Sequence, residues 1–221
     1  MDPLHASIAL GPAAVYLLLL GVINLSSRPF VTSGLRDTAA LGVAISGFVI
    51  SGPMELFLPE SLAYATNRGW LVWALLILFY ALCLTLLVLL QRPRIVIYNV
   101  TPEQLRPVLA DVVRKLDKDA RMVGESVFFP NLGVQMHVEA TTAVKNVQLK
   151  SAGAMQSYQG WREVELALHA GLRETRGAAN PYAVSLLLFG MVMVGIIGYW
   201  MANQGDVIAE AWREMMRTPA E

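Results

Sequence analysis

The sequence predicts an integral membrane protein, with four transmembrane α-helices and a small two-layer α+β domain inserted between the third and fourth helices. Hydrophobic residues make up 55% of the 221 residues and only 15% are charged, whereas a soluble domain has about 25% charged residues. Four stretches are long and apolar enough to cross a bilayer, which takes roughly 20 residues. Between two of them, over residues 92–180, the apolar spacing changes to that of strands and amphipathic helices.

The four predicted spans form a three-helix region within residues 1–91 and a single helix after the inserted domain; they cover about 6–27, 38–58, 70–91 and 181–205. The first is interpreted as a retained helix, because it lacks the basic start and the cleavage site of a signal peptide. The second is rich in glycine, alanine and serine four residues apart, which lets helices approach closely. The tail, 206–221, is predicted to form an amphipathic helix, either on the membrane surface or extending the fourth span into water.

Residues 92–180 show the order strand, helix, three strands, helix. Residues 95–98 are a short apolar run, typical of a strand buried on both faces. Thr101 and Gln104 have the spacing of a capping box at the start of a helix. Further strands are expected at 122–129, 134–140 and 146–150, and a second helix at 158–176. This order predicts a mostly antiparallel sheet with both helices on one face.

The strand periodicity also predicts a polar sheet face. His137 and Glu139 alternate with apolar residues, so they share a face directed away from the core, together with Gln135, Asn146, Gln148 and Lys150. His137 and Glu139 are candidate functional residues, since both side chains can bind a metal ion. A catalytic zinc needs about three protein ligands, and no third is apparent, so a solvated face is the preferred interpretation. The sequence therefore predicts no metal, no cofactor and no catalytic residue.

Glu55 is the candidate functional residue of the membrane region. It is the only acidic or basic residue embedded in a hydrophobic run, and such residues often mark ion or proton pathways. Pro53 precedes it, however, and a proline can end the helix there, which would leave Glu55 at the interface. No second intramembrane charge is present to pair with it. Both interpretations of Glu55, functional and structural, stay open.

The absence of known motifs limits the function classes. The sequence has no phosphate-binding loop, dinucleotide fingerprint, HExxH or CxxC, and its single cysteine, Cys83, lies in an apolar span. The 17 basic and 17 acidic residues balance, which argues against a nucleic-acid partner. The preferred hypothesis is a non-enzymatic assembly, scaffold or regulatory component of a membrane complex, with a protein partner or a second copy of the chain. A small-solute transporter or channel subunit using Glu55 is the alternative, and a membrane-bound enzyme is the third hypothesis.

The basic residues predict the orientation, because cytoplasmic ends of spans carry more Lys and Arg. Six arginines would lie on one side of the membrane: Arg28, Arg36, Arg92, Arg94, Arg173 and Arg176. The last four adjoin the inserted domain, and we expect them to contact the anionic lipid surface. Residues 92–180 are therefore predicted to be cytoplasmic and both termini to lie outside. Arginine outnumbers lysine 13 to 4, a composition common in GC-rich bacteria, so the predicted location is a bacterial inner membrane.

The orientation can be tested by cysteine labelling in intact cells, with Cys83 first replaced by alanine. A cysteine introduced at Ser126 should stay unlabelled by a membrane-impermeant maleimide until the cells are opened. A cysteine at Gln204, on the predicted outer side, should be labelled at once. Labelling of the Ser126→Cys variant from outside would show that the topology is inverted.

Overall fold

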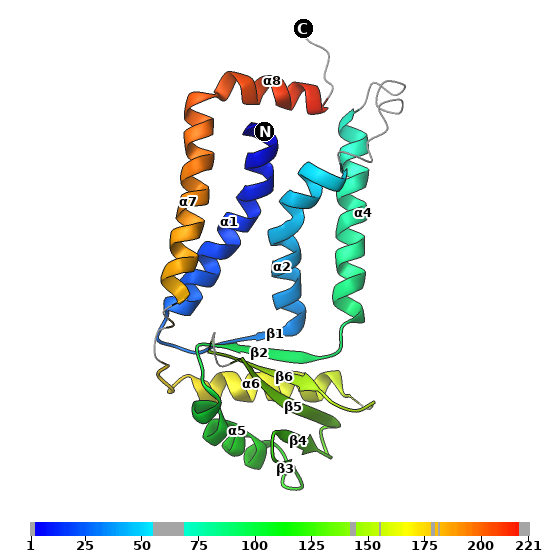
Figure 1. Ribbon diagram of the computed structural model, residues 1–221. Coiled ribbons are helices and arrows are strands. Elements are labelled where there is room, and N and C mark those ends of the chain that lie inside the picture. Colours follow the sequence, from blue (N-terminus) through cyan, green and yellow to red (C-terminus); the bar gives the residue numbers. More distant parts are fainter. Residues whose placement is uncertain are drawn as a thin grey trace. The chain divides into compact units, whose positions relative to one another are not determined.

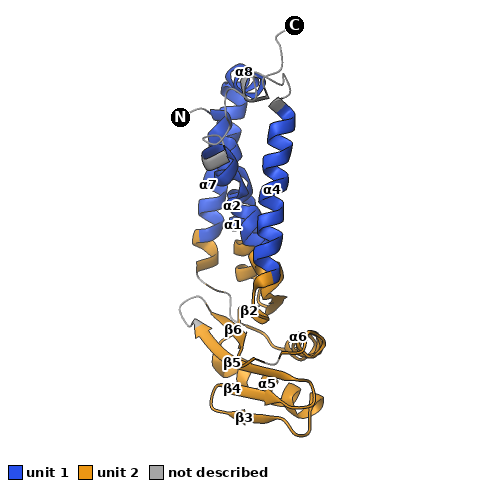
Figure 2. Ribbon diagram, turned by 90° about the vertical axis from the view of Figure 1, so that its right-hand side faces the viewer, with its two compact units in different colours: residues 1–19, 39–89, 186–221 blue, residues 20–38, 90–185 orange. Residues whose placement is uncertain are grey.

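The computed structural model describes residues 3–54, 69–141, 145–154, 156–177, 180 and 182–216. The chain divides into two compact units (Figure 2). The first consists of residues 1–19, 39–89 and 186–221, and the second of residues 20–38 and 90–185. Three of the long helices begin in one unit and end in the other, and the last residue of a fourth lies in the second unit.

The long helices are apolar, apart from Arg36 and Asp37 in the first turn of α2. They are α1 (Pro3–Leu25), α2 (Gly34–Val49), which continues as the π-helix η1 (Ile50–Met54), α4 (Gly69–Leu90) and α7 (Tyr182–Asn203), followed by the shorter α8 (Gly205–Met216) (Figure 1). In the described part of the chain, four helices are long and apolar enough to cross a membrane, which confirms the prediction of four such helices. Side chains on α4 face outward, with Phe79 65% and Leu90 75% exposed. Such a surface suits a lipid environment.

Helix α2 differs from the predicted span at both ends. It begins at Gly34, four residues before the predicted start, and places Asp37 in its first turn, where a carboxylate is favoured by the helix dipole. It changes to π-helix at Ile50, three residues before Pro53. Proline cannot donate the backbone hydrogen bond that an α-helix requires, which accounts for the change.

Glycines mark the close contacts of the first unit. A Cβ atom added at Gly47 would overlap the backbone carbonyl oxygens of Ile8 and Ala9, so α1 and α2 touch through their backbones. The Tyr80 hydroxyl on α4 donates a 2.7 Å hydrogen bond to the carbonyl oxygen of Gly42 on α2. Helix α2 therefore contacts two neighbours, in agreement with its small-residue pattern.

The second unit contains a six-stranded antiparallel sheet with the strand order β1-β2-β6-β5-β4-β3. The strands are β1 (Phe30–Ser33), β2 (Arg94–Tyr98), β3 (Arg121–Val123), β4 (Ser126–Phe129), β5 (Val134–Thr141) and β6 (Asn146–Ser151). A small antiparallel sheet was predicted and is confirmed. Helices α5 (Pro102–Leu116) and α6 (Tyr158–Leu172) complete this unit.

One core joins both helices to one face of the sheet. Its buried members include Ile95 and Ile97 of β2, Leu109 of α5, and Val164 and Leu168 of α6. The predicted capping box is present: the Gln104 backbone donates to the Thr101 hydroxyl, and the Gln104 side chain accepts from the Thr101 backbone. Helix α6 ends at Leu172 rather than 176, because the chain turns at Arg173 and Glu174.

The sheet has two more strands than predicted. The single strand expected over 122–129 was wrong: Gly124, with φ +60°, and Glu125 form a two-residue turn that folds this segment into the hairpin β3–β4. A two-residue turn that begins with a glycine at positive φ is a common hairpin connection. Strand β1 was missed because it lies between two spans, outside residues 92–180. It pairs with β2 and brings Val31 into the core.

We expect Gly47→Ala to destabilise the purified full-length protein, because its Cβ would displace the α1 backbone and not a flexible side chain. Overpacking of this kind costs about 1–3 kcal/mol. Gly195→Ala in α7 is the matched control, since a Cβ there meets nothing within 4 Å. Thermal unfolding in detergent measures both variants, and equal melting temperatures would contradict the close α1–α2 contact.

Candidate functional site

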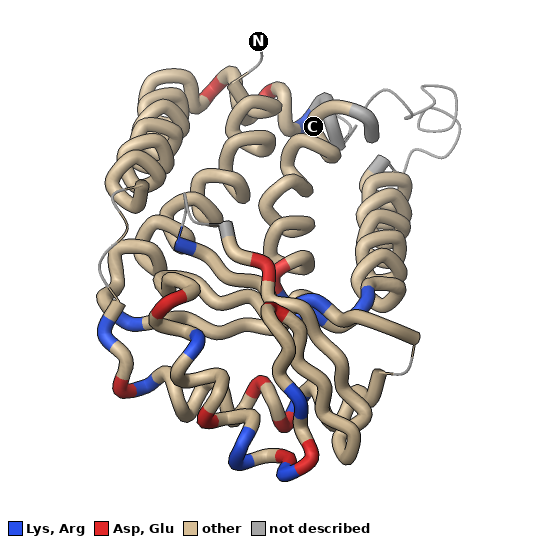
Figure 3. The backbone as a smooth tube through the Cα atoms, turned by 60° about the horizontal axis from the view of Figure 1, so that its bottom comes forward, with Lys and Arg blue, Asp and Glu red and all other residues tan. Residues whose placement is uncertain are grey.

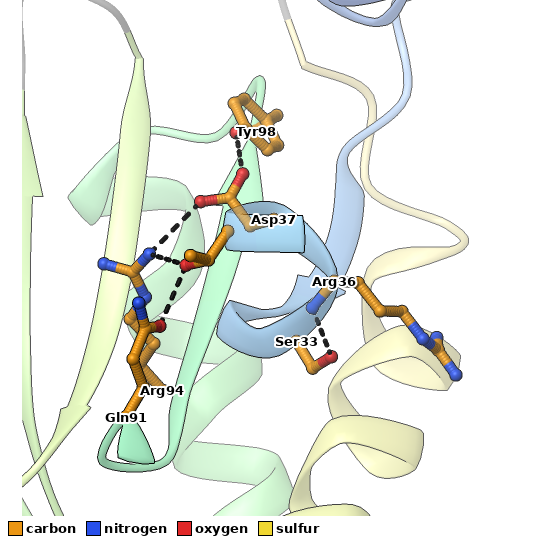
Figure 4. Close-up of polar contacts among 7 residues, drawn as sticks. Ser33, Arg36, Asp37, Gln91, Arg94 and Tyr98 are labelled. Atoms are coloured by element: carbon orange, nitrogen blue, oxygen red, sulfur yellow. Dashed lines mark hydrogen bonds and ion pairs between the residues drawn. The ribbon is translucent and has the colours of Figure 1, made fainter. Parts of the chain in front are cut away.

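The first turn of α2 is bound to β2 by a polar cluster (Figure 4). Asp37 accepts a 2.6 Å hydrogen bond from the Tyr98 hydroxyl and lies 3.4 Å from Nη2 of Arg94. The same Arg94 nitrogen donates to Thr38 Oγ1 at 3.0 Å, and the Thr38 hydroxyl donates to Gln91 Oε1 at 2.8 Å. These five residues bring the start of α2, the segment after α4 and strand β2 together within the second unit.

The Asp37 cluster also covers the second face of β2. Arg94 and Tyr98 lie two residues on either side of Val96, so all three share a face. Val96 is 0% exposed, and its face is opposite the α5–α6 core. Since Asp37 contacts both flanking side chains, the first turn of α2 lies over Val96. The ring of Phe30, 6.3 Å from that of Tyr98, adds to this cover.

Three buried asparagines form a second polar cluster in the same unit. Asn99 donates from Nδ2 to the carbonyl oxygens of Ile23 and Ser26 at the end of α1, the latter at 3.0 Å. Asn180 donates from Nδ2 to Asn24 Oδ1 at 3.2 Å, and its own Oδ1 accepts from the Tyr182 backbone at the start of α7. Carbonyl oxygens at a helix end have no partner within the helix. The asparagines supply donors for α1 and an acceptor for α7.

The two clusters hold the structure together and show no catalytic arrangement. The Asp37 cluster is joined by side-chain hydrogen bonds, and the asparagines bond mainly to backbone carbonyl oxygens. Asn24, Asn99 and Asn180 are at most 5% exposed. A substrate therefore has no access to the three asparagines. The Asp37 cluster joins the start of α2 and the segment after α4 to strand β2. The asparagines join the end of α1 to Asn99, which follows β2, and to the start of α7.

A groove of about 970 Å³ in the second unit is the candidate functional site. It lies between the N-terminal half of α6, the β1–α2 junction and the start of β2. Its apolar lining includes two strongly exposed side chains of α6, Tyr158 at 61% and Leu166 at 63%. Trp161 is buried at its base and donates a 2.8 Å hydrogen bond to Gln156 Oε1. The volume is at the upper end of the range for binding pockets, about 300–1,000 Å³.

Charged side chains surround this apolar groove. They are Arg36, Arg94, Arg162, Glu163 and Glu165. Arg36 lies 3.7 Å from Glu165 and is 78% exposed, so their attraction is weak. Arg94 is engaged by Asp37, and Glu163 accepts a hydrogen bond from Gln159. Among the described residues, Arg162 forms no ion pair with a carboxylate, which leaves it free to bind one.

The candidate residues His137 and Glu139 lie on the exposed sheet face, each about half exposed. Ser126 Oγ lies 3.2 Å from His137 Nδ1, and Glu125 lies 3.7 Å from its Nε2. Glu139 pairs with Lys150, whose hydrogen bond and positive charge lower the pKa of the Glu139 carboxyl. This row resembles a solvated ion-pair surface, because His137, Glu125, Glu139 and Lys150 are each about half exposed or more. Within the described ranges, no group of three metal-binding side chains occurs.

The other candidates have separate positions. Arg92, Arg173 and Arg176 are exposed, whereas Arg94 is half-buried against Asp37. Glu55 lies outside the described residues. Sequence reasoning missed Asp37, Asn24, Asn99 and Asn180. The available signal was their position: polar residues that end an apolar run, next to a change of periodicity.

A scan against protein-family models, a search of curated proteins and a search of solved structures each gave no match.

We expect Asp37→Ala to lower the melting temperature of the full-length protein, because it leaves Arg94 and Tyr98 without their shared carboxylate. Loss of a partly buried charged hydrogen-bond partner costs about 1.5–3 kcal/mol. Asp111→Ala is the matched control, since Asp111 forms an exposed ion pair with Arg114 on the surface of α5. Equal destabilisation by the two variants would contradict the role assigned to Asp37.

Proposed function

We propose that the protein is a non-enzymatic assembly component of a membrane complex, and that the α6 groove binds its protein partner. The observation that carries this proposal is the exposure of Tyr158 and Leu166 at the groove. Protein interfaces have an apolar centre and a polar rim, and the groove has both. The polar face containing His137 and Glu139 lacks such a centre, which makes it the less suitable docking surface.

The charges favour a partner different from this chain. In a symmetric dimer built on this groove, the same surface of each copy would meet. The carboxylates that this surface could offer to Arg162 are those of Glu163 and Glu165, which are already engaged by Gln159 and Arg36. A partner segment with apolar side chains and a carboxylate would fill the groove and pair with Arg162 instead. The proposed partner is therefore a protein with an acidic, apolar segment close to the membrane.

The proposal includes the predicted orientation, in which residues 92–180 are cytoplasmic, both termini are outside and the membrane is a bacterial inner membrane. Charged residues gather in the second unit, whereas the long helices are almost free of them (Figure 3). Residues 92–181 contain 12 basic and 9 acidic residues, and the rest of the chain 5 and 8. Helices α1 and α4 end, and α2 and α7 begin, in or next to the second unit. This alternation supports one membrane side for all four ends.

The groove can be tested with a photocrosslinking amino acid placed at Leu166 in the full-length protein in cells. We expect an adduct heavier than the 24.2 kDa chain, containing one identified membrane protein. The same photocrosslinker at His137 is the control and should give no such adduct. Arg162→Glu, added to the Leu166 variant, should lower the adduct yield roughly tenfold, the effect of losing about 1.4 kcal/mol of binding free energy.

Two results would overturn the proposal. An adduct of twice the chain mass that contains peptides of this chain alone would identify a second copy as the occupant. An adduct of equal yield from Leu166 and His137, unchanged by Arg162→Glu, would show that the groove is not a docking site. Glu55→Gln tests the rival transporter or channel function in the same cells: loss of a solute flux with the Leu166 adduct retained would favour that rival.

A further inference from the structure

A smaller pocket in the second unit has a different chemistry from the α6 groove. It has a volume of about 200 Å³ and lies between the segment that joins α1 to β1 and the C-terminal turn of α6. Val31 and Leu172, both buried, form its apolar base, with Pro29 beside them. Arg28, His169 and Arg173 are exposed and complete its lining. The volume suits a small headgroup and is below that of typical drug-sized ligand sites.

The pocket has a strong excess of positive charge. No carboxylate is among its lining residues, and within the described ranges neither Arg28 nor Arg173 forms an ion pair. The C-terminus of α6 contributes about half a negative charge. Two guanidinium groups exceed that by more than one unit charge, so the pocket favours an anion. Guanidinium groups also match the geometry of phosphate oxygens.

We propose that this pocket binds the phosphate group of an anionic phospholipid. Two observations favour a lipid over a phosphate free in solution. Arg28 follows the last residue of the apolar helix α1 by three residues, and Arg173 precedes the first residue of α7 by nine. The apolar base formed by Val31 and Leu172 suits the glycerol and first acyl carbons of a lipid better than a fully hydrated ion. The site is independent of the α6 groove, with which it shares no lining residue.

The proposal assigns distinct roles to the juxtamembrane arginines. Arg94 is held by Asp37 and Thr38 and has little freedom to bind lipid. Arg28 and Arg173 come from segments far apart in the sequence and converge on one pocket. They therefore bind one headgroup together, whereas Arg92 and Arg176, both exposed, do not line this pocket.

The test is a titration of the full-length protein, purified in a neutral detergent, with short-chain phosphatidylglycerol. Binding is measured by isothermal titration calorimetry, with short-chain phosphatidylcholine and inorganic phosphate as separate probes. We expect phosphatidylglycerol to bind and phosphatidylcholine and inorganic phosphate to bind at least tenfold more weakly. The double variant Arg28→Gln/Arg173→Gln should bind phosphatidylglycerol about thirtyfold more weakly, the effect of removing two basic residues near a lipid surface.

The matched control is Arg106→Gln/Arg121→Gln, which removes the same charge from exposed positions of α5 and β3. It should leave the affinity unchanged, and the melting temperatures of both double variants show that they are folded. Equal weakening by the two double variants would reduce the effect to general charge attraction and overturn the pocket. Inorganic phosphate that binds as tightly as phosphatidylglycerol would overturn the lipid assignment.

Discussion

The burial of β2 on both faces is the constraint on which the second unit depends. Ile95 and Ile97 face α5 and α6, and Val96 is buried on the opposite side. With β1 on one edge and β6 on the other, β2 has no free edge. A strand enclosed in this way needs cover that the 92–180 segment does not supply, because its two helices lie on one face. Strand β1 and the first turn of α2 supply that cover from outside the segment.

The same constraint explains the buried polar residues. Where an apolar helix ends inside protein, its last carbonyl oxygens need donors, and an unpartnered one costs about 1–3 kcal/mol. Asn99 supplies that donor for α1, and Asp37 accepts hydrogen bonds from the two polar side chains that flank Val96, through the Tyr98 hydroxyl and Nη2 of Arg94. These groups are occupied by the protein itself. The exposed groups that stay available, such as Arg162, Arg28 and Arg173, are therefore the ones to which binding is assigned.

Much of the architecture followed from local patterns in the sequence. The four long helices, the Thr101 capping box and the alternation in β5 are each determined within a few residues of chain. The positions of β1, of the Asp37 cluster and of both pockets could not be predicted. They depend on contacts between residues 37 and 94 or 24 and 180, and on residues 28 and 173 lining one pocket. The spacing of apolar residues along the chain does not indicate which distant residues come together. Gly124 was a local signal for a hairpin, but the apolar residues on both sides resembled one continuous strand.

The position of β1 has a consequence for how the chain is made. Its partner, β2, is synthesised only after the whole of α2 and α4, about sixty residues later. In a chain that enters and leaves a bilayer between these strands, the sheet can close only when both helices have inserted as a returning pair. If either helix failed to insert, β1 and β2 would lie in different compartments. Strand β2 would then have an unpaired edge, and such edges promote aggregation. In such a chain, the pairing of β1 with β2 requires both strands to lie on the same side of the bilayer.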